Sequence, residues 1–498
     1  MGEFLYHPYP MSHVDLRELA FQMRSEELRK YGQDVLRRDP SRIAPAEVLD
    51  LMAYLVACDF VGAEAKCNTI KFKFKGTKDE VYLNEATSLA RAHIDFAFGR
   101  FKDMEEAANS FLTNHRTIPN LEEGEFLDVL RLLAQKQMIL DEYEDLRRTY
   151  QEMVNYKSTV NSTNLHYLID SVQAMLLLAD GEYFKAMEMA KLNIEIANQN
   201  GYTGLMAPLD SMYVLAGTLF ATSRSQESQA LYVQLKETSK KLNLWPWYFI
   251  ADGFIAREYA YRRDMSGALA LVREERNLLS EFSFRHELNF IPDVNELYVR
   301  FLISDWERVE VLVNRVPQLI FVQQIASFLW ELKGDDMLKY IESLPDKTAR
   351  QKVYKSLALA GYYKDKESVS IDYMREALEV VEQSGSIELI LRQHDLFSIV
   401  LKAIAKKPTA FLENIGTRLT ERIKLINQHK TDGMPVPLTN RELEIVKHLS
   451  TGKPIRAIGE ILHISMNTMK THLRNIYRKL EVEGRDSAVE KAKELFLI

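Results

Sequence analysis

Apolar side chains recur at helical spacing along nearly the whole chain, and the breaks between the apolar stretches are themselves periodic. Each break has a short turn with a small or acidic residue, followed by a bulky residue. The residue three positions after the bulky one is used here as the marker of the repeat. The segment Gly181–Ala186, GEYFKA, is the clearest example. Successive markers lie 40, 42, 40, 44, 38 and 41 residues apart. They are Glu64, Met104, Leu146, Ala186, Ala230, Ala268 and Val309. This spacing fits two helices and their turns, so the pattern predicts a series of helical hairpins.

A single hairpin of this length cannot bury its apolar face, so neighbouring hairpins are expected to stack around one continuous core. We therefore predict an all-α, helical-hairpin solenoid over residues 45–395. A helical cap is expected over residues 1–44, with a helix from about Val14 to Lys30. The turn resembles that of tetratricopeptide repeats, although the units are longer than the 34 residues usual in that family. The alternative is an irregular all-helical domain whose periodicity arises by chance.

The last sixty residues show a different pattern, which predicts four short helices separated by clear turn signals. Thr439 and Glu442 have the spacing of a capping box. Gly452 stands where a left-handed C-cap is expected, and Pro454 suits the first turn of the next helix. Ser465 is a good N-cap for a third helix that ends near Leu480. The inward positions are predicted to be Leu443, Val446 and Leu449 in the first helix, Ile455, Ile458, Ile461 and Leu462 in the second, and Met469, Leu473, Ile476 and Leu480 in the third.

This segment resembles the LuxR-type (GerE-type) DNA-binding domain of bacterial transcription regulators, a four-helix domain with a helix-turn-helix. The resemblance is carried by Leu438, Thr439, Arg441, Glu442, Gly452, Ile458, Ile464, Ser465, Thr468, Lys470, His472, Asn475, Ile476, Lys479, Leu480, Arg485 and Ala488. After the glycine turn the family usually has Asn-Lys-Glu-Ile-Ala, whereas this chain has IRAIG at residues 455–459. Ala457 removes a carboxylate, and Gly459 inside a helix costs about 1 kcal/mol relative to alanine.

The resemblance implies that the third helix enters the major groove of double-stranded DNA with its N-terminal half leading. Base-edge contacts are implied for Lys470, Thr471 and Arg474. Contacts to phosphate, which fix the register of the protein on the duplex, are expected from Asn467, Thr468, Lys479 and Arg456. The fourth helix, predicted over Asp486–Leu497, is the surface through which such domains dimerise, so a homodimer on an inverted-repeat site is expected.

The distribution of charge agrees with a single DNA-binding module at residues 435–498. From Leu401 onward there are 18 lysines and arginines against 11 aspartates and glutamates, whereas the preceding residues have 46 against 60. A basic C-terminal part can approach the phosphate backbone, and an acidic remainder would be repelled by it.

The sequence contains no recognisable catalytic or cofactor-binding motif. It has no P-loop, no G-x-G-x-x-G, no H-E-x-x-H and no G-x-S-x-G, and its histidines have no partners at metal-ligand spacing. We therefore predict that the chain is not an enzyme and has no catalytic residue, cofactor or metal. Cys58 and Cys67 are the only cysteines and are read as small buried residues. Without a long apolar stretch or an N-terminal signal, the expected location is the cytoplasm, with no membrane contact.

Three further segments lie between the main elements. Residues 70–75, IKFKFK, alternate apolar and basic side chains, which favours an extended connection or, less often, a partner-binding ribbon. Trp245 and Trp247 fall between predicted helices and are read as a packing corner, with a ligand groove as the alternative. Residues 396–434 are expected to hold one more helix pair and a polar hinge over 427–433, before a stiff spacer at Pro435–Pro437.

Helical repeats followed by a LuxR-type domain resemble the C-terminal half of MalT-like regulators. Those proteins have a P-loop ATPase in front of the repeats, and no P-loop occurs here, so ATP-driven assembly is not expected. The sequence favours a DNA-binding transcription regulator whose repeat array senses a peptide, small molecule or protein and controls the C-terminal head. The alternative is a helical-repeat interaction scaffold with a degenerate head that does not bind DNA.

Overall fold

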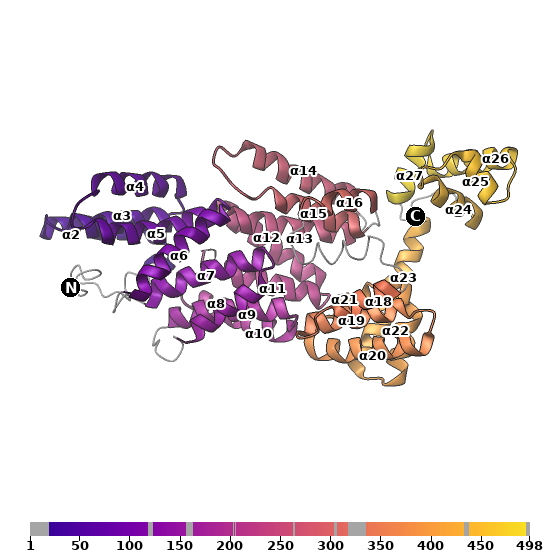
Figure 1. Ribbon diagram of the computed structural model, residues 1–498, viewed down its shortest axis with the longest axis horizontal. Coiled ribbons are helices and arrows are strands. Elements are labelled where there is room, and N and C mark those ends of the chain that lie inside the picture. Colours follow the sequence, from indigo (N-terminus) through magenta and orange to yellow (C-terminus); the bar gives the residue numbers. More distant parts are fainter. Residues whose placement is uncertain are drawn as a thin grey trace.

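The computed structural model describes residues 19–117, 123–155, 163–202, 204, 206–261, 264–302, 306–316, 335–432 and 438–494. All regular elements in these ranges are helices, so the prediction of an all-α chain is confirmed. Consecutive helices pack against each other as antiparallel hairpins that stack side by side (Figure 1). None of the described helices is long and apolar enough to cross a membrane.

The first helix of each hairpin lies in the interior of the array, and the second follows after a tight turn. The hairpins are α3 (Ile43–Val56) with α4 (Phe60–Lys73), α5 (Glu80–Ala97) with α6 (Phe101–Thr117), α7 (Glu123–Ile139) with α8 (Tyr143–Val154), α9 (Thr163–Asp180) with α10 (Tyr183–Gln199), α11 (Leu209–Ala221) with α12 (Ser225–Lys241), α13 (Trp245–Tyr261) with α14 (Met265–Glu281), α15 (Phe290–Leu302) with α16 (Trp306–Val313), and α19 (Ala349–Tyr362) with α20 (Glu367–Ser384). The helix α18 (Asp335–Ser343) precedes the last of them.

The repeat is more regular in the structure than in the sequence pattern. The fourth residue of every second helix from α4 to α16 is buried, and these residues lie 41, 42, 40, 42, 40 and 41 positions apart. They are Ala63, Met104, Leu146, Ala186, Ser228, Ala268 and Val309. Five of the seven predicted markers are therefore right. Glu64 is one position late and Ala230, which is exposed, two positions late. The second slip arose because the buried residue there is polar: the Ser228 hydroxyl is satisfied by donating to the carbonyl of Ala216 at 2.9 Å.

Five of the hairpins share one turn conformation built from different residues. The residue two positions before the second helix has a left-handed backbone in five hairpins: Cys58, Gly99, Asp141, Gly181 and Ser223. The left-handed residue turns the chain so that the next backbone amide can donate a hydrogen bond to a carbonyl of the first helix. The amide of Glu182, for example, donates to the carbonyl of Leu177 at 2.9 Å. A left-handed residue with a side chain costs roughly 1–2 kcal/mol. At Cys58, Asp141 and Ser223 the turn forms without a glycine, because the packed helices on both sides enforce it.

The chain has a separate hydrophobic core for each of its three main parts. The largest core extends from Ala44 to Ile291 and follows the stacked hairpins. A second core, from Val353 to Leu419, joins α19 and α20 to α22 (Phe397–Lys406) and α23 (Ala410–Asp432). A third core, from Leu438 to Ala492, belongs to the four C-terminal helices. The helix α23 leads from the second block toward the C-terminal helices (Figure 1).

Several sequence-based expectations at the ends of the array are wrong. The N-terminal helix α2 is Ser25–Arg38, after a break at Met23, whose φ is 54°, whereas Val14 lies outside the described residues. Residues 70–73 continue the helix α4 and are not extended, because Ile70 is buried in the main core. The polar residues 427–432, expected to form a hinge, belong to α23. The spacer Pro435–Pro437 lies outside the described residues.

The predicted packing roles of the cysteines and of Trp247 are confirmed. Cys58 and Cys67 are free and buried. Trp247, in the first turn of α13, is 1% exposed and contacts the rings of Phe96 and Tyr213. Trp247 therefore fills the junction between α5, α11 and α13 and is not part of a groove.

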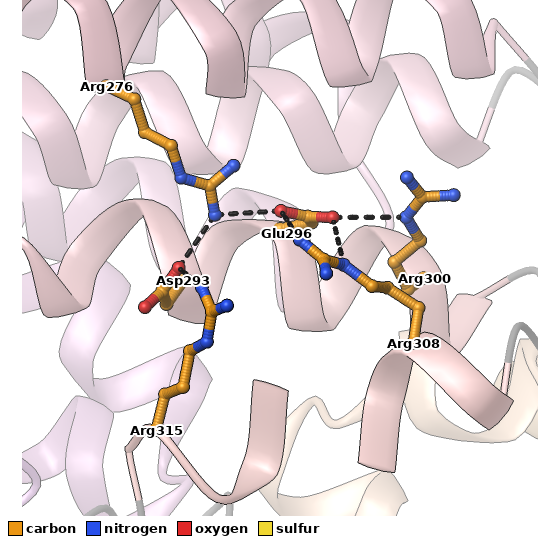
Figure 2. Close-up of polar contacts among 6 residues, drawn as sticks. All are labelled: Arg276, Asp293, Glu296, Arg300, Arg308 and Arg315. Atoms are coloured by element: carbon orange, nitrogen blue, oxygen red, sulfur yellow. Dashed lines mark hydrogen bonds and ion pairs between the residues drawn. The ribbon is translucent and has the colours of Figure 1, made fainter. Parts of the chain in front are cut away.

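A network of charged side chains fixes α15 between α14 and α16 (Figure 2). Arg276 reaches both carboxylates of α15, Asp293 at 2.7 Å and Glu296 at 2.8 Å. Arg308 on α16 contacts Glu296 at 3.0 Å, and Arg315 contacts Asp293 at 3.5 Å. Burial alone would raise the pKa of the Glu296 carboxyl, but hydrogen bonds from Arg308 and Arg276 hold it below its usual value. One face of α15 is thus held by arginines while the other faces the interior of the array.

Candidate nucleic-acid interface

The C-terminal part folds as four short helices, and side-chain hydrogen bonds cap the starts of the first and the third. They are α24 (Asn440–Leu449), α25 (Ile455–Ile461), α26 (Met466–Leu480) and α27 (Arg485–Glu494). Thr439 and Glu442 form the predicted capping box at the start of α24. Ser465 caps α26 by accepting a hydrogen bond from the amide of Thr468 at 3.2 Å. Gly452 has the predicted left-handed backbone, with φ of 73°.

The inner face of α26 is apolar and buried over four turns, as its spacing predicts. Met469, Leu473, Ile476 and Leu480 are at most 6% exposed and belong to the third core. The same core receives Ile458 and Leu462 from the region of α25. Ile461, also predicted to face inward, is 44% exposed, because α25 is so short that only one of its faces meets the core. The packing leaves the opposite face of α26 uncovered by the other three helices.

The outer face of α26 carries basic and small polar side chains on successive turns. Asn467, Lys470, Thr471 and Arg474 are all exposed and lie three or four residues apart, which places them on one side of the helix. The turn before α26 is tight, because His463 has a φ of 54° and the amide of Ile464 bonds back to the carbonyl of Gly459 at 2.9 Å. The arrangement is a helix, a three-residue turn and a second helix with an exposed cationic face.

Comparisons with known proteins agree with this geometry. Residues 436–492 match the family described as bacterial regulatory proteins, luxR family. The carboxyl-terminal segment is a LuxR-family helix-turn-helix domain. The chain is also 24% identical to the transcriptional regulator MalT of Vibrio cholerae over 55% of this chain and 27% of that protein. It is 44% identical to the transcriptional regulatory protein LiaR of Bacillus subtilis over 24% of this chain and 56% of that protein.

The chain spans 27% of the length of the first of these relatives and 56% of the second. Their names are those of transcription regulators, which agrees with the prediction that this chain is not an enzyme. Among solved structures, a Rap protein complexed with competence and sporulation factor matches with a TM-score of 0.43 and 13% identity. That match covers 76% of this chain and 99% of the other.

Six of the seven residues predicted to contact DNA are exposed on the LuxR-family domain. Asn467, Lys470, Thr471 and Arg474 share the outer face of α26. Thr468 is exposed at the start of the same helix, and its hydroxyl hydrogen-bonds with that of Ser465 at 2.8 Å. Arg456 lies on α25, with a side chain that is 84% exposed and 3.4 Å from Glu460. These six are all available to a ligand that approaches α26 from outside.

Lys479 is placed differently from the other six. Its side chain is 11% exposed, and its ammonium donates to the Glu442 carboxylate at 2.7 Å. Burial alone would raise the pKa of Glu442, but the hydrogen bond from Lys479 and those at Thr439 hold it below its usual value. Lys479 therefore joins the end of α26 to the start of α24 inside the domain.

Two arginines of the LuxR-type pattern also have internal roles. Arg485 donates to the carbonyl of Leu449 at 2.7 Å, which satisfies the end of α24. Arg441 donates to the carbonyl of Leu462 at the end of α25. Some of the residues that carry the resemblance thus hold the four helices together, whereas others, such as Thr468 and Lys470, are exposed on α26.

Gly459 has a structural explanation that its helix propensity does not reveal. A Cβ atom at this position would lie 3.2 Å from the carbonyl oxygen of Ile464. The absence of a side chain lets the turn of the helix-turn-helix pack closely on α25. The cost of glycine in a helix is therefore offset by this close approach.

Sequence reasoning missed a second candidate site, a cavity in the repeat array between α11, α13, α15 and α19. Its polar residues include Arg257, Arg350 and Asn295, which are separated by tens of positions in the chain. No local motif links them, and only the stacking of the hairpins brings them together.

Proposed function

We propose that this protein is a transcription regulator that binds double-stranded DNA through the exposed face of α26. The observation that carries the proposal is the cationic outer face of a helix whose inner face is packed into a LuxR-family domain. A helix fits into the major groove of DNA, and the N-terminal half of the second helix of a helix-turn-helix contacts base edges. We expect Lys470, Thr471 and Arg474 to contact bases. Asn467, Thr468 and Arg456, which are also exposed, are expected to contact phosphates.

The fourth helix, α27, is the proposed contact between two copies on DNA. Ala488 and Ala492 on its inner side are buried within the domain, while Asp486 and Ser487 are exposed. Two copies related by a twofold axis would read half-sites roughly one turn of DNA apart. The repeat array would receive an effector and control the head through α23. A regulator that works on DNA in this way would act in the cytoplasm.

Selection of binding sites from random duplex DNA by the full-length protein tests the proposal. An enriched inverted repeat is expected at about 100 mM salt, where nonspecific binding is partly screened. Lys470→Ala and Arg474→Ala should each weaken binding to that site by about 1–3 kcal/mol and relax the preference at one base position. Lys447→Ala removes an exposed cation from α24, outside the proposed reading face, and serves as the matched control.

Asn467→Ala and Arg456→Ala should weaken binding to all sequences alike if they contact phosphate. The Arg456 change should also make the salt slope shallower by about one unit, because one fewer counterion is released. Failure of the folded protein to enrich any sequence would reject DNA recognition and leave the interaction scaffold as the better account.

A further inference from the structure

A cavity of about 230 Å³ lies where the main core of the array meets the block formed by α19–α23. Its walls come from α11, α13 and α15 on one side and from α19 and α21 (Ile387–Leu391) on the other. Rings of Tyr213, Phe220, Phe254, Tyr298 and Tyr354 supply much of the lining. The face of α15 opposite the arginine network of Figure 2 contributes Val294, Asn295 and Tyr298, so this wall is held in place from behind.

Two arginines, Arg257 and Arg350, bring positive charge to the cavity. The Arg257 guanidinium lies between two rings, 3.5 Å from the ring centre of Tyr298 and 4.4 Å from that of Phe254. Its Nε is buried and has no hydrogen-bond partner. Arg350 donates to the carbonyl of Leu178 at 2.8 Å and to the Tyr143 hydroxyl at 3.3 Å, both neutral groups.

The carboxylates at the cavity edge are engaged by other groups. Glu388 accepts from Arg422 at 2.7 Å and lies 3.5 Å from Arg392, so two arginines compensate its charge. Asp141 accepts a hydrogen bond from the neutral Tyr143 hydroxyl at 2.6 Å, and its charge acts on Arg350. The described lining nevertheless holds more positive than negative groups, since Arg257, Arg350 and Arg392 face Asp141 and Glu388. Planar guanidinium groups stacked on rings are well suited to bind a carboxylate.

Tyr213 adds a hydrogen-bond donor to this charge. Burial raises the pKa of Tyr213 to about 12, so its hydroxyl keeps its proton at neutral pH. The Tyr143 hydroxyl already donates to Asp141 and therefore orients that carboxylate instead of donating to a ligand. The volume limits the size of the ligand, because an apolar cavity of roughly 150 Å³ is known to hold one benzene molecule. A space of about 230 Å³ fits a ring or a short chain with a carboxyl group, and is too small for an extended peptide.

We propose that this cavity is the effector site of the array and that it binds a small organic monocarboxylate with an apolar or aromatic body. The carboxylate would contact Arg257 and Arg350, and the apolar body would lie against the rings of α11 and α13. The regulatory part of this inference rests on the proposed function above, whereas the binding part does not.

The position of the cavity explains how ligand binding would affect the DNA-binding head. Arg350 and Tyr354 belong to the second block, while Arg257 and Tyr213 belong to the main array, so one ligand contacts both. Within the second block, the contact between Arg422 and Glu388 ties α23 to α21, which lines the cavity. Arg418 of α23 also donates to the carbonyl of Ser223 in the main array at 2.8 Å. A ligand that favours one arrangement of the two blocks would shift the position of α23.

Calorimetric titration of the full-length protein with phenylacetate, hexanoate and indole-3-acetate at pH 7 tests binding. At least one acid is expected to bind, and its uncharged amide should bind at least tenfold more weakly. Arg257→Met should weaken acid binding at least tenfold, while Arg148→Met, an exposed arginine on α8, should leave it unchanged. Ala221→Phe, which fills the cavity without removing a charge, should also abolish binding. Thermal unfolding of each variant shows that it is folded.

Three results would overturn the site: no binding by any of the acids, equal binding by wild type and Arg257→Met, or binding only by a pentapeptide with a free carboxyl end. The same acid should change the affinity of the wild-type protein for its selected DNA site at least threefold, but not that of Arg257→Met. An acid that binds and leaves DNA affinity unchanged would overturn the regulatory role alone. Acid binding by a protein that enriches no DNA sequence would reject the proposed function and keep the site.

Discussion

Lys479 offers a sharp contrast between a residue that binds DNA and one that holds the domain together. The sequence pattern assigns it to phosphate, whereas in the structure its ammonium is 2.7 Å from Glu442 and its side chain is 11% exposed. In Lys479→Ala the Glu442 carboxylate, whose side chain is 4% exposed, keeps the hydrogen bond from the Thr439 amide but loses its cationic partner. Removing one partner of a fully buried ion pair costs about 3–5 kcal/mol. Since Lys479 retains some exposure, we expect about 2–3 kcal/mol.

The C-terminal domain is small, so a loss of this size is a large part of its stability. Domains have roughly 0.05–0.15 kcal/mol of stability per residue, which gives only several kcal/mol here. Hydrogen exchange of the full-length protein, followed by mass spectrometry, measures the change locally. The protection of amides in α24 and α26 should fall about thirty- to hundredfold, because each 1.4 kcal/mol corresponds to a factor of ten. Amides in α9 and α11 of the same molecules provide an internal reference.

Lys470→Ala is the matched control, since it removes an exposed lysine from the same helix. It should leave amide protection unchanged and weaken DNA binding. The reasoning would be refuted if Lys479→Ala kept full protection in α24 and α26 and lost DNA affinity to the same extent as Lys470→Ala. That outcome would show that Lys479 leaves Glu442 and contacts phosphate, as the sequence pattern predicts.

Three further predictions concern stability. Burial raises the pKa of Glu275 well above its usual value, so the folded state holds a proton that the unfolded state releases. The free energy of unfolding therefore falls as pH rises above about 4.3. Glu275→Gln should flatten this decline in urea unfolding between pH 5 and 8, and an unchanged slope would contradict the prediction. Gly181→Ala should destabilise the fold by more than Gly201→Ala. Both glycines are left-handed, but only at Gly181 would a Cβ meet backbone, 2.7 Å from the amide nitrogen of Arg350; equal unfolding midpoints would disprove the close approach. Thr439→Ala should cost about 1 kcal/mol through loss of the capping box, measured as amide protection in the first turn of α24. Thr451→Ala is the control, because the Thr451 hydroxyl donates to the carbonyl of His448 at the opposite end of α24 and satisfies no amide of the first turn.

Local signals predicted the C-terminal domain well, because its elements are set by neighbours in the chain. The capping box of Thr439 and the Ser465 cap lie within a few residues of the groups they contact, and the four inward positions of α26 follow from the spacing of apolar residues within one helix. Ile461 was wrongly predicted to face inward, because helical periodicity does not say how much of a short helix is buried by neighbouring helices. Lys479 was misplaced for a related reason, since Glu442 is 37 residues away.

The sequence by itself determined the all-α class, the period of the hairpins and the cationic face of α26, since each follows from side chains three or four positions apart. Only the tertiary structure decided which lysine is exposed, which residues adopt left-handed turns without glycine, and which arginines meet in the cavity between the array and the second block. Those outcomes depend on burial and on contacts between residues that are tens to hundreds of positions apart, such as Arg350 with Leu178. The free energy of such contacts arises only when the stacked helices exclude water, and no local pattern in the chain records it.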